Sequence, residues 1–297
     1  MRHDVVLLNN SARGLSSAGL PEQIEALFRS HQRDIVIQQV MSPIDIPRAA
    51  RSAVEQNAEV IVAGGGDGTI SAVASVLAGS EIPLGVLPLG TLNHFAKDLQ
   101  IPLDLDKAVE TIVERHVRRV DVGHLGNRIF VNNASIGIYP NIIEIRERLR
   151  QLGHWKWPAF ARATFEGLRR DEEVSIRLET DRTRIVAHTP FLFIGNNEYQ
   201  GEGIHLGERL RLDGGQIFAY FAPPVRTRDL PKLFASSLLG YARQERALQS
   251  ISATELWVDI PSARPMKVAC DGELLTLTPP LHVRAWPGAL NVITPAT

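Results

Sequence analysis

The first 120 residues alternate short apolar runs with segments whose apolar residues recur at helical spacing. The runs predict buried strands, and the segments between them predict helices. We expect strands at 4–8, 34–40, 59–63 and 84–87, and helices at 21–31, 46–56, 69–77 and 91–99. This alternation predicts an α/β domain with a parallel sheet that carries helices on both faces.

The pattern changes after Val120. Residues 121–138, 173–195 and 208–221 read as strands, many of them alternating, with turn residues between them. Such text predicts a mainly β region arranged as an antiparallel sandwich. A chain of 297 residues has room for two domains. We therefore expect an α/β domain at 1–120, to which the C-terminal tail can return, and a β-rich domain at 121–297.

Charge and cysteine content narrow the class of protein. The 32 basic and 33 acidic residues leave a net charge of −1, which argues against a dedicated nucleic-acid binder. The single cysteine, Cys270, allows no internal disulfide and favours a reducing compartment. No stretch approaches the roughly 18–20 apolar residues of a membrane span. These features predict a soluble, cytoplasmic protein.

A glycine-rich segment, Gly64-Gly65-Gly66-Asp67-Gly68-Thr69, follows the predicted strand at 59–63 and precedes a predicted helix. Glycines let a ligand approach the backbone closely, and the free N–H groups at a helix N-terminus attract phosphate. The chain contains no Gly-Lys pair for a Walker A loop, and Thr69 stands where a dinucleotide fingerprint has its third glycine. The segment predicts a phosphate site of another kind; an ordinary glycine turn is the alternative.

The segment 88–93 repeats this arrangement after the next predicted strand. Thr91 is expected to cap the helix that follows and to face a phosphate, while the Asn93 amide can donate and accept hydrogen bonds. A helix cap without a ligand is the alternative interpretation.

Asp271-Gly272-Glu273 offers two carboxylates separated by one residue. On an extended segment these side chains point the same way, so both can face one cleft as a general base and its support. Because Asp-Gly is also a strong turn signal, a plain hairpin turn is the alternative.

Gly65-Gly66-Asp67-Gly68-Thr69, Pro88-Leu89-Gly90-Thr91-Leu92-Asn93 and Asp271-Gly272-Glu273 together resemble the diacylglycerol kinase catalytic-domain family. That family includes soluble bacterial lipid kinases and sphingosine kinases, and it is related to NAD kinases and phosphofructokinases. The resemblance also takes in segments 121–123, 133–137 and 212–215, and thus covers nearly the whole chain. His94 departs from the family, which usually has an aspartate there.

The resemblance implies an ATP-dependent lipid kinase that transfers a γ-phosphoryl group, with Mg²⁺, to a hydroxyl of diacylglycerol or a sphingoid-like lipid. It implies Asp271 as general base and Glu273 as its support. Residues expected to bind ATP are Asn9, Gly65, Gly66, Asp67, Gly68, Thr69, Thr91 and Asn93. Asp213 resembles part of an Asp-Asp-Gly metal motif, although Gly214 replaces the second aspartate.

Residues 142–170 combine an apolar stripe with tryptophans and a surplus of arginine and lysine. Such a segment suits the headgroup region of an anionic membrane, which predicts peripheral contact with the inner membrane surface. The alternative is a core-facing helix with solvated arginines. A homodimer is left open.

Two other functions compete with a lipid kinase. The first is a kinase for a soluble substrate, similar to NAD kinases, because the glycine-rich segment is shared with them. The second is a relative that binds a lipid or nucleotide without catalysis, against which the intact Asp271 and Glu273 argue.

Overall fold

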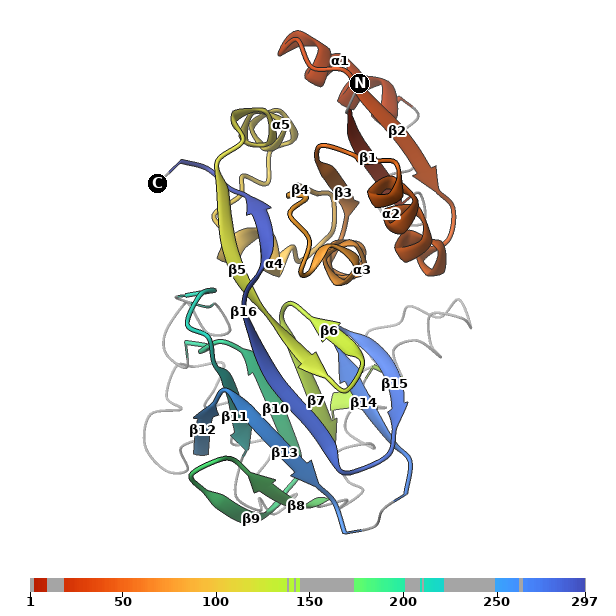
Figure 1. The fold of residues 1–297 in the computed structure, drawn as a ribbon. Helices are drawn as coiled ribbons and strands as arrows, with labels where there is room; N and C mark the ends of the chain where they lie inside the picture. Colours follow the sequence, from red (N-terminus) through yellow and green to blue (C-terminus); the bar gives the residue numbers. More distant parts are fainter. Residues whose placement is uncertain are drawn as a thin grey trace, which may run out of the picture.

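The computed structural model of the chain joins an α/β layer to a region built almost entirely of antiparallel strands (Figure 1). It describes residues 3–9, 19–137, 139–141, 143–144, 174–200, 209, 211–221, 249–261 and 264–296. This arrangement confirms the fold predicted from the sequence, a parallel-sheet α/β part followed by a mainly β part.

The four strands and four helices predicted for the first part are confirmed, with ends that differ by a few residues. They are β1 (Asp4–Asn9), α1 (Leu20–Ser30), β2 (Ile35–Val40), α2 (Ile46–Glu55), β3 (Ile61–Gly65), α3 (Asp67–Leu77), β4 (Leu84–Pro88) and α4 (His94–Asp98). A 3-10 turn, η1 (Pro43–Asp45), precedes α2. The pattern missed α5 (Leu105–Glu114), which begins where the Asp104 side chain accepts a hydrogen bond from the Lys107 N–H.

The strands β1, β3 and β4 are buried throughout, whereas the edge strand β2 is partly exposed. Val5 and Leu7 of β1 belong to the buried cluster that includes α2 and α3, whereas Val6 and Leu8 belong to the one that includes α1 and α5. Because successive side chains of a strand point to opposite faces, one short apolar run supplies both layers of core.

The remaining strands pair almost exclusively in antiparallel fashion. They are β5 (Val117–Leu125), β6 (Arg128–Phe130), β7 (Asn133–Gly137), β8 (Val174–Glu179), β9 (Arg184–Thr189), β10 (Phe191–Asn196), β11 (Ile217–Phe221), β12 (Gln249–Ala253), β13 (Glu255–Asp259), β14 (Met266–Cys270), β15 (Glu273–Leu277) and β16 (Leu281–Ile293). Six of them form a sheet in the order β12-β11-β10-β7-β14-β15. Ile136 and Ile194 of this sheet share a buried cluster with Val258 and Val283 of the other sheet, as in a sandwich.

One strand, β16, belongs to both parts of the molecule. Its first half pairs with β13, and its second half lies parallel to β4 through Val292 and Leu84. Eight strands of the ten-stranded sheet therefore follow the order β2-β1-β3-β4-β16-β13-β8-β9, and β5 and β6 join the sheet beside β16. Strand β5 pairs with β16 along nearly its whole length, with a shift in register between Trp286 and Leu290. Figure 1 shows this pair running from the α/β layer into the β-rich region. Residue 120 lies within β5, so the structure shows no break in the chain there. The division into domains at residue 120 stays a prediction.

The basic stretch predicted at 142–170 falls outside the described residues, apart from residues 143 and 144. Within the part of the chain that is described, no helix is long and apolar enough to cross a bilayer.

The β5–β6 hairpin offers a test of packing between its two strands. A methyl group on Gly123 would overlap the ring of Phe130, which is fully buried. We expect Gly123→Ala to lower the free energy of unfolding by about 1–3 kcal/mol, as overpacking does. Chemical denaturation measures this change. Gly68→Ala is the control, because a methyl there meets nothing within 4 Å, and it is expected to lose no stability. Equal stability of the two variants would contradict this packing.

Candidate active site

The carboxyl ends of β1 and β3 meet at the point where the sheet order reverses. The order β2-β1-β3-β4 places β2 on one side of β1 and β3 on the other. The ends of β1 and β3 are therefore the position at which open α/β sheets have their ligand-binding crevice. Asn9 ends β1, and its amide donates a hydrogen bond of 2.9 Å to the Thr69 hydroxyl on α3. The structure thus brings two of the expected nucleotide-binding residues together at a position where open α/β sheets bind ligands.

The two glycine-containing loops pack directly against each other. The Leu89 N–H donates to the Gly65 carbonyl at 3.0 Å, and the Phe95 N–H donates to Asp67 Oδ1 at 3.2 Å. Gly66 and Gly90 approach so closely that a methyl group on Gly90 would overlap the Gly66 backbone. The glycines are therefore needed for contact between the loops, and Asp67 ties the start of α3 to the start of α4.

The structure corrects the expectation that Thr91 caps the following helix. The N-cap of α4 is Asn93, whose φ of 51° is left-handed, so the helix begins at His94 and Thr91 lies exposed in the preceding bend. The Asn93 side chain is buried and donates to the carbonyls of Pro88 and Gly90 while accepting from the Gly90 N–H. Asn93 consequently shapes the loop, and contact of either residue with a nucleotide stays a prediction.

Asp271 lies in the turn between β14 and β15, and its side chain contacts the first turns of α3, close to the first glycine loop. Its Oδ2 accepts a hydrogen bond of 2.5 Å from the Ser71 hydroxyl, two residues beyond Thr69. Oδ2 also accepts from the Val131 N–H at 2.8 Å, and Oδ1 accepts from the N–H groups of Asn132 and Asn133 at 2.9 and 3.0 Å. Four donors therefore hold the carboxylate against both the nucleotide-side helix and the start of β7.

Burial and hydrogen bonding act on Asp271 in opposite directions. Burial raises the pKa of its carboxyl group, and the hydrogen bonds from Ser71 and from the three N–H groups offset part of that rise. A raised pKa is one property of a general base, and that role of Asp271 stays a prediction. Asp271 also has a left-handed φ of 45°, followed by Gly272 at 83°, so it occupies the turn that the Asp-Gly pair indicates.

Glu273 and Cys270 lie on either side of this turn. Glu273 is exposed at the first position of β15, opposite Cys270 on β14. Burial, followed by the negative charges of Asp271 and Glu273, raises the pKa of the Cys270 thiol, so the thiol stays protonated. The supporting role of Glu273 stays a prediction.

A second buried carboxylate, Asp121, organises the loop that carries Asp213. It accepts hydrogen bonds from the N–H groups of Gly215 at 2.6 Å and Gly288 at 2.8 Å, and from the Asn197 amide at 3.1 Å. The sequence drew attention to segment 121–123 only through resemblance, and it offered no separate signal for Asn197 or Ser71.

The Asp213 carboxylate pairs with Arg118 at 3.3 Å and with Arg211 at 3.2 Å. Burial raises the pKa of Asp213, but hydrogen bonds and charge from these arginines outweigh it and lower the pKa below its ordinary value. A metal-binding role for Asp213 stays a prediction. Among the described residues, no group of three or more His, Cys, Asp or Glu side chains is arranged to hold a metal ion.

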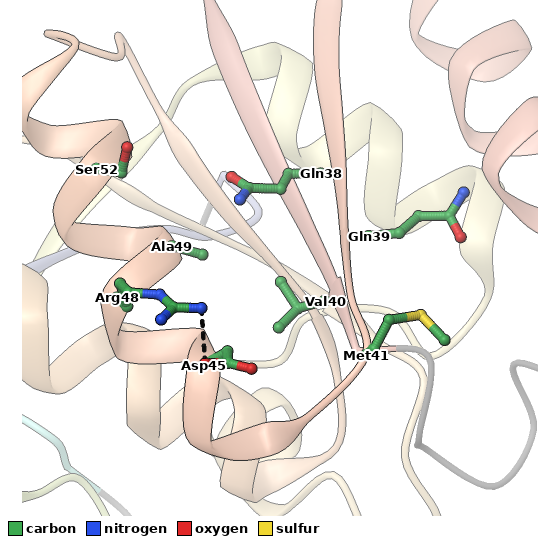
Figure 2. A pocket seen from close by; sticks show the side chains of 8 residues that line it. All are labelled: Gln38, Gln39, Val40, Met41, Asp45, Arg48, Ala49 and Ser52. Carbon is green, nitrogen blue, oxygen red and sulfur yellow. Dashed lines mark ion pairs between the residues drawn. The ribbon is translucent and has the colours of Figure 1, made fainter.

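A pocket of about 390 Å³ lies beside the end of β2, which Figure 2 shows from close by. Its lining is mainly polar and comes from Gln38, Gln39, Val40, Met41, Asp45, Arg48, Ala49 and Ser52. Arg48 and Asp45 form an ion pair of 2.9 Å within it. Val40 is the direct neighbour of Asn9 in the sheet, so the pocket adjoins the crevice at the strand ends.

Two glycine-containing loops lie against each other at the end of a parallel sheet, and a carboxylate lies beside them. This arrangement is typical of enzymes that transfer phosphoryl groups. Comparison with known proteins specifies the class. Residues 3–125 match the family model of the diacylglycerol kinase catalytic domain, and residues 141–294 match the YegS C-terminal NAD kinase beta sandwich-like domain. The chain belongs to the diacylglycerol kinase family, and it is a kinase.

Relatives agree with this assignment, and a solved structure shares the fold. A diacylglycerol kinase of Staphylococcus saprophyticus is 37% identical over 231 residues, covering 76% of this chain and 73% of the relative. One of Staphylococcus aureus is 33% identical over 236 residues, covering 77% and 72%. The crystal structure of a diacylglycerol kinase from Bacillus anthracis shares the fold, with a TM-score of 0.71, 19% identity and coverage of 99% and 97%.

The contact between Gly66 and Gly90 yields a prediction about nucleotide binding. Because a methyl group on Gly90 overlaps the Gly66 backbone and lies 2.7 Å from Asn93 Oδ1, Gly90→Ala forces the loops apart. We expect ATP affinity to fall by about tenfold or more, which corresponds to about 1.4 kcal/mol. Isothermal titration calorimetry checks this expectation, with Val186→Ala at an exposed position of β9 as the control. Unchanged affinity in Gly90→Ala would show that ATP does not depend on the contact.

Proposed function

We propose that the protein is an ATP-dependent lipid kinase that transfers the γ-phosphoryl group to a hydroxyl of a lipid alcohol, either diacylglycerol or a sphingoid-like lipid. The observation that carries this proposal is the hydrogen bond between Ser71 and Asp271. It brings a buried carboxylate to the helix that begins at the glycine loop. A phosphoryl transfer needs groups that bind the phosphates and a base close to them.

In this proposal ATP lies across the crevice at the ends of β1 and β3. The N-terminus of α3 and the loop at Gly65–Thr69 receive the phosphates, with Asn9 and the segment 90–93 beside them. The pocket next to Val40 is suited to the nucleoside half, because it adjoins Asn9 and is mainly polar.

The carboxylate of Asp67 lies between the two loops and suits a Mg²⁺ ion shared with the phosphates. When bound, such an ion neutralises negative charge on the transferred group. The protein's own contribution is to orient the phosphates through main-chain N–H groups and to hold the acceptor hydroxyl near Asp271.

Asp271 would accept the proton of the lipid hydroxyl. The lipid oxygen would form the new bond to the γ-phosphorus while the bond between that phosphorus and ADP breaks. The Asp271 carboxylate already accepts four hydrogen bonds, so one donor must leave before the carboxylate can accept a proton. Three donors are main-chain N–H groups with fixed directions, whereas the Ser71 hydroxyl can rotate. Rotation of Ser71 frees Oδ2 for the substrate.

The acceptor decides between this proposal and its alternatives. We expect incubation with γ-labelled ATP and a total lipid extract to place the label in the organic phase. Label in an aqueous product would favour a soluble-substrate kinase similar to NAD kinases, and lipid binding without transfer would favour a non-catalytic relative.

Further parts of the proposal concern location and organisation. We propose a nucleotide-binding domain at 1–120, a lipid-substrate domain at 121–297, and a cytoplasmic protein that touches an anionic membrane surface through residues 142–170. Flotation with vesicles that contain anionic lipid tests the membrane contact. Homodimer formation remains part of this proposal and is tested by light scattering.

The role of Asp271 as base predicts the effect of removing its charge. We expect Asp271→Asn to lower kcat by about 10²–10⁴-fold, the usual contribution of a general base, while ATP still binds. Product formation and calorimetric ATP binding, measured on the same preparation, test this. Wild-type kcat in the variant would remove Asp271 from the reaction.

Ser71→Ala distinguishes a role of Asp271 as base from a purely structural role of its carboxylate. It deletes one donor to Oδ2 and leaves the three main-chain N–H groups in place. We expect it to retain turnover far above that of Asp271→Asn. Equal losses in both variants would indicate that the carboxylate serves only to hold the loop.

The raised pKa of Asp271 predicts the acid side of the pH profile. A base acts when ionised, so kcat/KM is expected to rise with pH through a pKa above the ordinary aspartate value of 3.8. The sign for stability is opposite, because ionisation of this carboxyl disfavours the folded state. Its contribution is greatest below 3.8 and falls as pH increases through the folded pKa. An acid limb of the profile at or below 3.8 would contradict this assignment.

A further inference from the structure

A buried arginine, Arg209, lies behind the backbone segment that holds Asp271. Its side chain is fully buried, and it pairs with the buried Asp98 at the last position of α4. The Arg209 Nε and Nη2 atoms both lie 2.8 Å from Asp98 Oδ2. The ion pair therefore connects residue 209 to the helix that follows the second glycine loop.

The rest of the Arg209 guanidinium binds the segment 131–132. One terminal nitrogen donates to the Val131 carbonyl at 2.6 Å and to the Asn196 carbonyl at 3.1 Å, and the other donates to Asn132 Oδ1 at 2.8 Å. The ring of Tyr199 lies 5.5 Å from the guanidinium carbon. A buried charge with this many partners has a single position, because leaving any of them would strand a polar group.

The Val131 carbonyl and the Asn132 N–H belong to the same peptide group. The guanidinium binds the oxygen end, and the nitrogen end donates to Asp271 Oδ1 at 2.9 Å. A cation on the carbonyl polarises the peptide and strengthens its N–H as a donor. The next peptide is held similarly, because the Asn132 carbonyl accepts from the Tyr199 hydroxyl at 3.0 Å while the Asn133 N–H donates to Asp271.

We propose that Arg209 is a positioning residue for Asp271, which holds the 131–132 peptide against the carboxylate and couples it through Asp98 to the second glycine loop. The proposal rests on the function proposed above. Arg209 does not touch the reacting atoms. It sets the orientation and the charge state of Asp271, which does.

Arg209 is the cation bonded to this peptide, while Arg128 of β6 acts by its charge on the neighbouring Cys270 thiol. The neighbouring titratable groups are the Cys270 thiol and the Tyr199 phenol, and burial is the main cause that raises the pKa of each, to about 12 for Tyr199. Both are neutral at physiological pH. Ser71 approaches from α3 and carries no charge, and Glu273 is exposed at the start of β15.

A pair of variants separates positioning from simple stabilisation. Asp98→Asn keeps the guanidinium on the 131–132 peptide but removes its counterion. The double variant Asp98→Asn with Arg209→Gln removes both charges, so no uncompensated charge remains buried. Arg209→Lys is the conservative variant, which keeps a positive charge in case the double variant does not fold.

The measurements are the pH dependence of kcat and the titration of the Asp271 carboxyl carbon by NMR with ¹³C-labelled aspartate, assigned with Asp271→Asn. In the double variant we expect both pKa values to move upward by about one unit, because the lost guanidinium is bonded to the peptide that donates to Asp271 and so outweighs the lost Asp98 carboxylate, which lies beyond the guanidinium. Asp98→Asn and Arg209→Lys are expected to stay near wild type, and ATP affinity should change less than kcat.

Three results would overturn the proposal: an unchanged Asp271 titration in the double variant, an equal shift in Asp98→Asn, or, if the double variant does not fold, an Arg209→Lys titration that differs from that of Asp98→Asn. The NMR titration needs no substrate. A wild-type protein without lipid kinase activity would therefore contradict the proposed function, while the effect of Arg209 on Asp271 would still be measured.

Discussion

The carboxylate of Asp271 joins the parts of the molecule that the proposed reaction requires. One of its oxygens is shared between Ser71 on α3 and the Val131 N–H, and the other receives the N–H groups at the start of β7. Each bond reaches a segment far from residue 271 in sequence. The position of this one group therefore depends on both the α/β layer and the β-rich region being in place.

Strands β5 and β16 make that dependence physical. They pair along almost their entire length, and β16 adds to the parallel sheet beside β4 at one end and to the antiparallel strands at the other. The two regions consequently share a continuous hydrogen-bonded sheet, where two-domain enzymes often have a linker.

The sequence predicted what depends on local order. Apolar runs such as 4–8 and 84–87 became buried strands, and the glycine loops lie at their carboxyl ends as expected. It failed where the outcome depends on a backbone angle or a distant partner. The left-handed Asn93 delays α4 past Thr91, and α5 was missed although Asp104 is a good N-cap. Contacts such as Arg209 with Asp98 join residues with no shared pattern, so they appear only in three dimensions.

The pairing of β4 with β16 has a consequence for how the protein reaches its folded state. Leu84 and Val292 are neighbours in the sheet although most of the chain separates them. Closing so long a loop costs entropy before any contact is gained, and contacts of this range slow folding. During synthesis, β4 would wait with an open edge until β16 emerged from the ribosome, and an open strand edge is prone to pair with other chains.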